Sequence, residues 1–164
     1  MKIIHASMPA DDPRHVAEVL SEIMGGEALP FPPGGPGSWM AWAADGILEI
    51  EIVPRGHVMH QGEKEAEWRQ EGEPRRLSEV HFAIGVNRPA AEIVAIAQRA
   101  AWPARTCTRG DMFDLIEVWV ENAFLLELFD PEQKRVYEEL VTLASWKELL
   151  AAGAPDPSGR PGLG

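Results

Sequence analysis

Cysteine is the residue that this sequence most clearly lacks. Cys107 is the only one in 164 residues, so the chain cannot form an internal disulfide, and no second cysteine is available for a zinc knuckle. No apolar run approaches the roughly 20 residues that a membrane-spanning helix needs. A charged stretch, Asp11 to Arg14, follows the first apolar residues directly, and no secretory signal is visible. We therefore expect a cytoplasmic protein.

Basic residues are also scarce. The chain has 15 Lys and Arg against 26 Asp and Glu, which gives a net charge of −11 at pH 7. Nucleic-acid phosphates and anionic membrane surfaces both attract basic protein surfaces. We expect neither nucleic acid nor a membrane as a partner. The 45% of hydrophobic and 25% of charged residues are typical of an ordinary single globular domain.

One order of segments occurs twice. In the first unit, residues 1–54, an apolar strand precedes a helix pattern that starts at Asp11 or Asp12 and ends at Gly25, and three strand-like segments follow. The second unit, residues 79–130, repeats this order. The repetition predicts an α+β fold built from two βαβββ units.

The remaining segments are simpler. The charged connector 55–78 is expected to be solvated and partly helical around residues 63–70. The apolar spacing over 131–152 predicts one or two amphipathic helices, and the Gly- and Pro-rich tail 153–164 is expected to be disordered. These patterns predict one domain over residues 1–130, followed by a helical extension.

A histidine and a glutamate recur at matched positions of the two units. His5 and Glu49 lie in apolar strand-like runs of the first unit, and His81 and Glu127 lie in the corresponding runs of the second. Because side chains alternate across a strand, all four fall on the face opposite their large apolar neighbours. Such a face is often simply wet in an antiparallel sheet. Matched placement in both units favours a shared site instead.

Two imidazoles and two carboxylates form a donor set that suits zinc, nickel, cobalt, iron or manganese. The sequence thus predicts a divalent metal held by His5, Glu49, His81 and Glu127. Four protein ligands leave one or two positions open, as a catalytic metal requires. We expect a homodimer, and the sequence leaves open whether the two pairs meet within one chain or between two chains.

Three further residues share the faces of these predicted ligands. Ser7 lies on the face of His5, and Glu51 lies on the face of Glu49. Trp119, on a predicted strand of the second unit, falls on the face away from the core. We expect these three side chains to line a substrate pocket, although a tryptophan packed at the rim of the core would show the same pattern.

At these positions the chain resembles the vicinal oxygen chelate superfamily, which includes glyoxalase I, bleomycin-resistance proteins, methylmalonyl-CoA epimerase and extradiol dioxygenases. The resemblance covers about residues 1–130. It implies two βαβββ units that form a curled mixed sheet with a metal on its concave side. It also implies that His5, Glu49, His81 and Glu127 occupy the four ligand positions of glyoxalase I. Dioxygenases of the superfamily keep two histidines and one glutamate, so the resemblance favours the glyoxalase and epimerase branch.

Two positions depart from bacterial glyoxalase I. In that enzyme an arginine and an asparagine hold glutathione, whereas Pro9 and Val53 stand at the matching places here. We therefore expect a substrate that is not a glutathione adduct.

The resemblance implies a metal-dependent lyase, isomerase or epimerase. Its small-molecule substrate would bind the metal through two adjacent oxygens, and Glu127 or Glu49 would remove a carbon-bound proton. Two alternatives remain open at this stage. One is a non-catalytic protein that sequesters a small molecule, as bleomycin-resistance proteins do. The other is an extradiol-type dioxygenase, which requires iron(II) and a Glu49 that is not a ligand.

Overall fold

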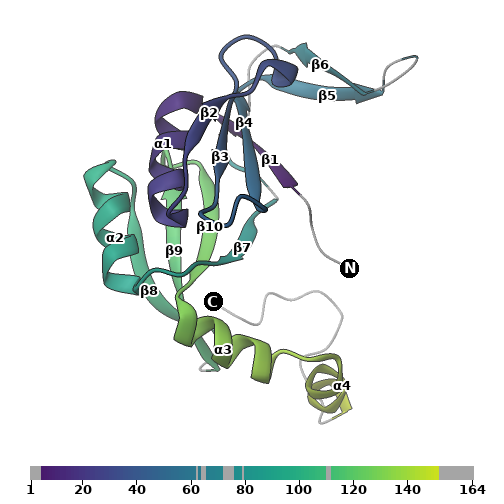
Figure 1. Cartoon of the computed structure of the whole chain (residues 1–164). Helices are drawn as coiled ribbons and strands as arrows, with labels where there is room; N and C mark the ends of the chain where they lie inside the picture. Colours follow the sequence, from purple (N-terminus) through teal and green to yellow (C-terminus); the bar gives the residue numbers. More distant parts are fainter. Residues whose placement is uncertain are drawn as a thin grey trace.

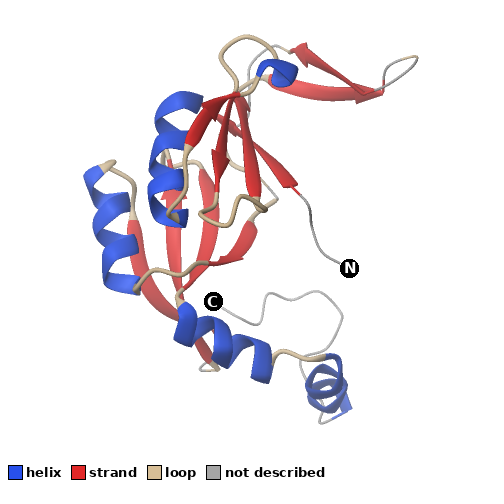
Figure 2. Cartoon of the chain, in the orientation of Figure 1, coloured by secondary structure: helices blue, strands red, loops and turns tan. Residues whose placement is uncertain are grey.

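The computed structural model describes residues 5–61, 63, 66–71, 76–78, 80–109 and 112–151. Two four-stranded sheets, each with a helix against one face, form the body of the molecule, and a two-stranded hairpin and two C-terminal helices extend from it (Figures 1 and 2). The first unit consists of β1 His5–Ala10, α1 Pro13–Met24, β2 Ala28–Pro30, the 3-10 turn η1 Pro32–Gly34, β3 Trp39–Trp42 and β4 Glu49–Pro54. The second consists of β7 Phe82–Gly85, α2 Ala90–Arg99, β8 Ala104–Arg109, β9 Phe113–Val120 and β10 Phe124–Phe129.

The two units share one topology. The strand order is β1-β4-β3-β2 in the first sheet and β7-β10-β9-β8 in the second. In each sheet the strand that comes first in the sequence pairs in parallel with the one that comes last, β1 with β4 and β7 with β10, and the other pairs are antiparallel. This confirms the prediction of an α+β fold with two βαβββ units.

Helix α1 shows how closely local sequence signals set the element ends. The side chain of Asp12 accepts a hydrogen bond from the backbone N–H of His15 at 3.1 Å, and Pro13 occupies the first turn. Gly25 ends the helix in the left-handed region at φ 73°, where a glycine has no Cβ to strain the backbone. The predicted start and end of this helix are therefore confirmed.

The hydrophobic core joins the two units. Helices α1 and α2 lie side by side (Figure 1), and strand residues from both sheets pack against them. Side chains with no more than 2% exposure come from both halves: Met8, Leu20, Ile50, Ile52, Ile93, Ile116, Leu126 and Leu128. Complete burial of one such side chain contributes about 2 kcal/mol, so the shared core favours one folded body.

A polar cluster, the Glu121 clamp, also ties the halves together. The Glu121 carboxylate accepts the backbone N–H groups of Asp11 and Asp12 at 2.5 and 2.7 Å. The nearly buried side chain of Arg55 binds both Asp11 (2.6 Å) and Glu121 (3.2 Å). Arg76 adds bonds to the Asp11 carboxylate and to the carbonyl of Glu121. Desolvation acts to raise the pKa of Asp11, but the two arginines outweigh it and the net pKa is lowered.

The connector differs from its prediction. Strands β5 His57–Gln61 and β6 Ala66–Gln70 form an antiparallel hairpin, so the expected helix around residues 63–70 is wrong. The register sets Met59 opposite Trp68, and such a cross-strand apolar pair stabilises a hairpin. The same charged segment offers no apolar stripe at helical spacing that could bury a helix against the core.

The start of the second unit is also shorter than expected. The predicted strand began at Val80, but β7 begins at Phe82, and Val80 is 54% exposed. His81 therefore lies directly before the strand rather than in it.

The C-terminal extension consists of α3 Pro131–Leu140 and α4 Leu143–Ala151, as predicted. Tyr137 of α3 packs against Phe113 and Phe129, with ring centroids 4.9 Å apart in both pairs. Helix α3 therefore lies against the second sheet, and α4 extends beyond it (Figure 1). The tail 153–164 and the residues before His5 lie outside the described part of the chain. None of the described helices is long and apolar enough to cross a membrane.

Candidate metal centre

The first half brings His5 and Glu49 together. They are register partners in the parallel pair of β1 and β4, so their side chains leave the sheet on the same face. The Nδ1 atom of His5 lies 3.8 Å from Oε1 of Glu49. The imidazole is half exposed and the carboxylate is largely covered. The pairing follows from strand register, which sequence spacing alone could not supply.

Glu51 and Ser7 form the next register pair on the same face. The hydroxyl of Ser7 donates a hydrogen bond of 2.6 Å to Oε2 of Glu51. The other oxygen of Glu51 lies 3.9 Å from Nε2 of His5. Each nitrogen of this imidazole therefore has a carboxylate within 4 Å, and the four residues form one polar group.

The second half repeats the pair. Glu127 lies on β10 and His81 lies just before β7, the parallel neighbour of β10. The Nε2 atom of His81 is 3.7 Å from Oε2 of Glu127. Each unit therefore sets its own histidine beside its own glutamate, at nearly the same separation.

Arg105 and Arg109 also belong to this face, and neither was predicted. Arg109 donates to Oε1 of Glu127 and to Oε1 of Glu117, both at 2.7 Å. Arg105 donates to Oε2 of Glu117 at 2.8 Å. The hydrogen bond to Glu127 is the main reason that the pKa of Arg109 is raised. We call the set Arg105, Glu117, Arg109 and Glu127 the arginine row.

Glu117 sits at the centre of the arginine row with only 5% exposure. Desolvation acts to raise the pKa of its carboxyl, and the hydrogen bonds from Arg105 and Arg109 more than offset it, so the pKa is lowered. Glu117 is therefore held as a carboxylate between two guanidinium groups.

Strand alternation contained a signal for the two arginines. Arg105, Cys107 and Arg109 stand at every second position of β8, so their side chains lie on the same face. The antiparallel register sets Arg105 opposite Glu117, and Glu117 opposite Glu127. Opposite charges across adjacent strands favour such pairing. The half-buried Cys107, whose pKa burial raises, lies on the same strand and has no predicted role.

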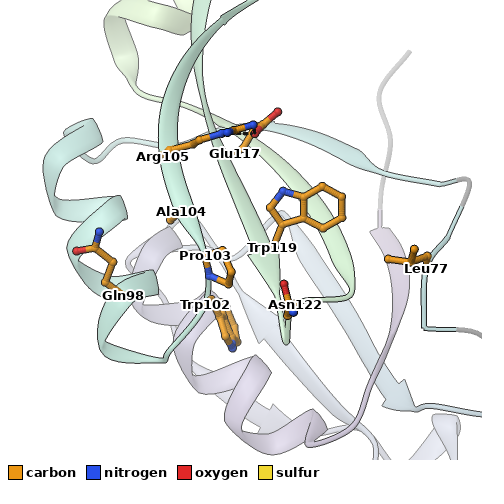
Figure 3. Close-up of a pocket in the computed structure, with 9 residues that line it drawn as sticks. All are labelled: Leu77, Gln98, Trp102, Pro103, Ala104, Arg105, Glu117, Trp119 and Asn122. Carbon is orange, nitrogen blue, oxygen red and sulfur yellow. Dashed lines mark hydrogen bonds and ion pairs between the residues drawn. The ribbon is translucent and has the colours of Figure 1, made fainter. Parts of the chain in front are cut away.

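Trp119 lines a hollow at the outer edge of the second sheet (Figure 3). Arg105 and Glu117 of the arginine row line the same hollow. The predicted pocket residues of the first half, Glu51 and Ser7, lie on the other sheet. The structure thus divides the predicted pocket residues between the two sheets.

The donor chemistry of each pair fits half of a metal site. Two ligand atoms about 2.1 Å from one ion stand roughly 3–4 Å apart, and the two His–Glu separations are 3.8 and 3.7 Å. Within the described part of the chain, however, no group of three or more His, Cys, Asp or Glu side chains could hold a metal ion. One chain therefore presents two separate His–Glu pairs, one in each unit.

Comparison with known proteins identifies the fold. A glyoxalase family protein from Bacillus anthracis aligns with a TM-score of 0.52 and 15% identity, covering 78% of this chain and 93% of that one. A fosfomycin resistance protein from Listeria monocytogenes, complexed with manganese(II) and sulfate, aligns with a TM-score of 0.52 and 14% identity over 85% and 98% of the two chains. The chain has a glyoxalase-like fold.

A third glyoxalase-like structure is equally similar. Lactoylglutathione lyase from Agrobacterium tumefaciens aligns with a TM-score of 0.52 and 11% identity, covering 80% of this chain and 94% of the lyase. No protein-family profile and no curated protein sequence matches the chain. At these identities the likeness establishes the glyoxalase-like fold and leaves the activity to be argued from the site.

Proposed function

We propose that this protein is a metal-dependent lyase, isomerase or epimerase that acts on a small substrate with two adjacent oxygens. The repeated His–Glu pair is the observation that supports this function. His5 and Glu49 in the first unit, and His81 and Glu127 in the second, offer the same two residue types at separations of 3.8 and 3.7 Å. The manganese(II) bound by the fosfomycin resistance protein of the same fold supports a divalent metal here.

We propose that the complete site forms between two chains. The His5–Glu49 pair of one protomer would meet the His81–Glu127 pair of its partner, so that a homodimer has two four-ligand sites. Support comes from the shared core, which packs the helices of the two units against each other, and from the separation of the half-sites within the described residues of one chain.

The bound metal would polarise the substrate oxygens and stabilise negative charge that develops on them. The two glutamates then differ in what they can do. Arg109 holds Oε1 of Glu127 and leaves Oε2 directed toward His81, which suits a fixed ligand. Among the described residues, Glu49 accepts no side-chain hydrogen bond and has only His5 as an ion-pair partner. We therefore assign Glu49 as the base that accepts the carbon-bound proton.

Glutathione is not part of the proposal. Pro9 and Val53 are register partners on the same face as His5 and Glu49. Val53 is only 2% exposed, and neither side chain can donate or accept a hydrogen bond. The positions at which glyoxalase I holds glutathione are thus apolar here.

Metal analysis of purified protein tests the site. We expect one divalent metal per chain in the wild type, and loss of the metal in both His5→Ala and Glu127→Ala. His60→Ala is the matched control, because His60 also pairs with a glutamate, Glu71, but on the β5–β6 hairpin. Its metal content should equal that of the wild type. Absence of metal from wild-type protein after incubation with zinc, nickel, cobalt, manganese and iron(II) would refute the proposal.

The assignments of assembly and substrate have their own tests. Sedimentation should give a dimer whose metal is lost on dilution to monomers. Methylglyoxal with glutathione should give no turnover, because the glutathione-holding positions are apolar.

A non-catalytic protein that sequesters a small molecule is the second candidate. The observation that favours it is the arginine row, in which Arg109 already occupies one oxygen of Glu127. A wild-type protein that binds small ligands equally well with and without metal would support this candidate over the enzyme.

A further inference from the structure

The hollow at the outer edge of the second sheet has a volume of about 730 Å³. Its walls come from three separate parts of the chain (Figure 3). Trp102, Pro103 and Arg105 come from the start of β8 and the loop before it, Glu117 and Trp119 come from β9, and Leu77 comes from the connector. A volume of this size accommodates a small organic molecule.

The apolar part of the hollow is built from opposed side chains. Figure 3 shows the indole of Trp119 projecting from β9 toward the side on which Leu77 lies, with Trp102 below. Arg76 binds the carbonyl of Glu121 at 3.0 Å and so anchors the connector next to Leu77. Leu77 itself is 68% exposed, so its apolar surface is available to a ligand.

The charged part of the hollow is cationic on its exposed side. Arg105 uses Nε and Nη2 to bind the same oxygen of Glu117, and a guanidinium group has five N–H donors in all. The Arg105 side chain is 73% exposed, whereas the Glu117 side chain is only 6% exposed. Among the described residues, the remaining N–H donors of Arg105 have no partner, so the hollow presents them and positive charge to an incoming molecule, on a chain whose net charge is −11.

The hollow lies beside the second half-site. Arg105, Glu117 and Glu127 are register partners on three adjacent strands. Neighbouring strands are about 4.8 Å apart, so Arg105 and Glu127 stand roughly 10 Å apart across the sheet. A molecule in the hollow can therefore extend along the arginine row to the predicted ligands.

We propose that this hollow binds an organic anion with an apolar, ring-bearing body. The acidic group pairs with the free N–H donors of Arg105, because planar guanidinium groups bind carboxylates in a forked geometry. The body packs between Trp119 and Leu77. We further propose that this anion is the part of the substrate that lies farthest from the metal. Only this last step rests on the proposed function.

Calorimetric titration of metal-free protein with 3-phenylpropionate and with its neutral amide, 3-phenylpropionamide, tests the hollow. Neither probe offers two adjacent oxygen-bearing carbons to a metal, so the measurement does not depend on the metal site. We expect the carboxylate to bind at least about tenfold tighter than the amide. Arg105→Gln should abolish this preference and Arg105→Lys should keep part of it. Arg69→Gln removes an equally charged exposed arginine on β6 and should leave the preference unchanged.

Two further variants complete the test. Trp119→Ala should lower the affinity for both probes, because it removes the apolar wall of the hollow. Glu49→Gln should leave the carboxylate affinity unchanged even if it removes the metal, so the hollow and the metal site can fail separately. Equal affinity of carboxylate and amide for the wild type, or an unchanged preference in a folded Arg105→Gln, would overturn the inference.

Discussion

The two halves of the molecule carry the same His–Glu pair and surround it differently. In the first half, His5 has Glu49 and Glu51 within 4 Å. Among the described residues, the only side chain that donates a hydrogen bond to either carboxylate is the neutral hydroxyl of Ser7. In the second half, Arg109 binds Glu127, and the neighbouring Glu117 lies between Arg105 and Arg109.

Under the proposed function, this difference gives the two halves different tasks. With a neutral histidine, the first group has two negative charges and no positive one, and an unpaired pair of carboxylates on a covered surface attracts a cation. The arginine row has two positively and two negatively charged side chains, so its net charge is zero. Under the proposed function, the first half would supply open carboxylates for the metal. The second half would supply a preformed set of ion pairs that orients Glu127 and leaves N–H donors of Arg105 for the substrate.

The largest expected effect concerns the two carboxylates of the first half. Glu49→Gln should lower the metal affinity by about 100-fold, because it removes an anionic ligand beside His5. Glu51→Gln should lower it by only about tenfold, because Glu51 is bound to Ser7 and acts through orientation. Equilibrium dialysis with zinc measures both. An equal loss of metal affinity in the two variants would show that Glu51 is itself a metal ligand. The first half would then supply three ligands.

The next effect concerns the join between the halves. Glu121→Ala should lower the free energy of unfolding by about 3 kcal/mol, because it removes the acceptor of three hydrogen bonds, one from the nearly buried Arg55 and two from the backbone N–H groups of Asp11 and Asp12. Urea unfolding followed by circular dichroism measures the change. Glu18→Ala is the control, since Arg14, itself exposed, is the ion-pair partner of Glu18 among the described residues; it should change the free energy by less than about 0.5 kcal/mol. If both variants unfold alike, the clamp does not hold the halves together.

Much of the fold was predictable because its signals are local. Asp12, Pro13 and Gly25 mark the ends of α1 through backbone geometry and capping alone, and alternation correctly set Phe82 and Ile84 toward the core. The prediction of a helix in the connector was wrong for a physical reason. Its charges resemble those of a solvated helix, and the pairing of Met59 with Trp68 becomes visible only once the two strands lie side by side.

The candidate site was predictable residue by residue but not as an assembly. Parity placed His5 and Glu49 on one face, and the register of β1 and β4 is what brings them together. Arg109 was missed because its partners, Glu117 and Glu127, come from two other strands. The separation of the two half-sites depends on how the units pack, which no local pattern encodes.

A smaller effect compares the buried Glu117 of the second half with the partly buried Glu51 of the first. Glu117→Gln should lower the free energy of unfolding by about 2 kcal/mol, because it uncouples two guanidinium groups from a nearly buried carboxylate. Glu51→Gln should cost less than about 0.5 kcal/mol, since an amide oxygen can still accept the bond from Ser7. Thermal and urea unfolding of metal-free protein measure both. A larger loss in Glu51→Gln would reverse the contrast between scaffold and open site.

The smallest effect is the acid dependence of the arginine row. Because the pKa of Glu117 in the folded protein is lowered below its ordinary value of 4.5, its carboxylate stabilises the fold above pH 4.5. This contribution is lost as the pH falls through the lowered pKa. The difference in unfolding free energy between wild type and Glu117→Gln should therefore be constant from pH 8 to pH 6 and shrink below pH 4.5. A difference that stays constant down to pH 3 would mean that the variant acts through packing rather than through charge, and that the second half is not an electrostatic scaffold.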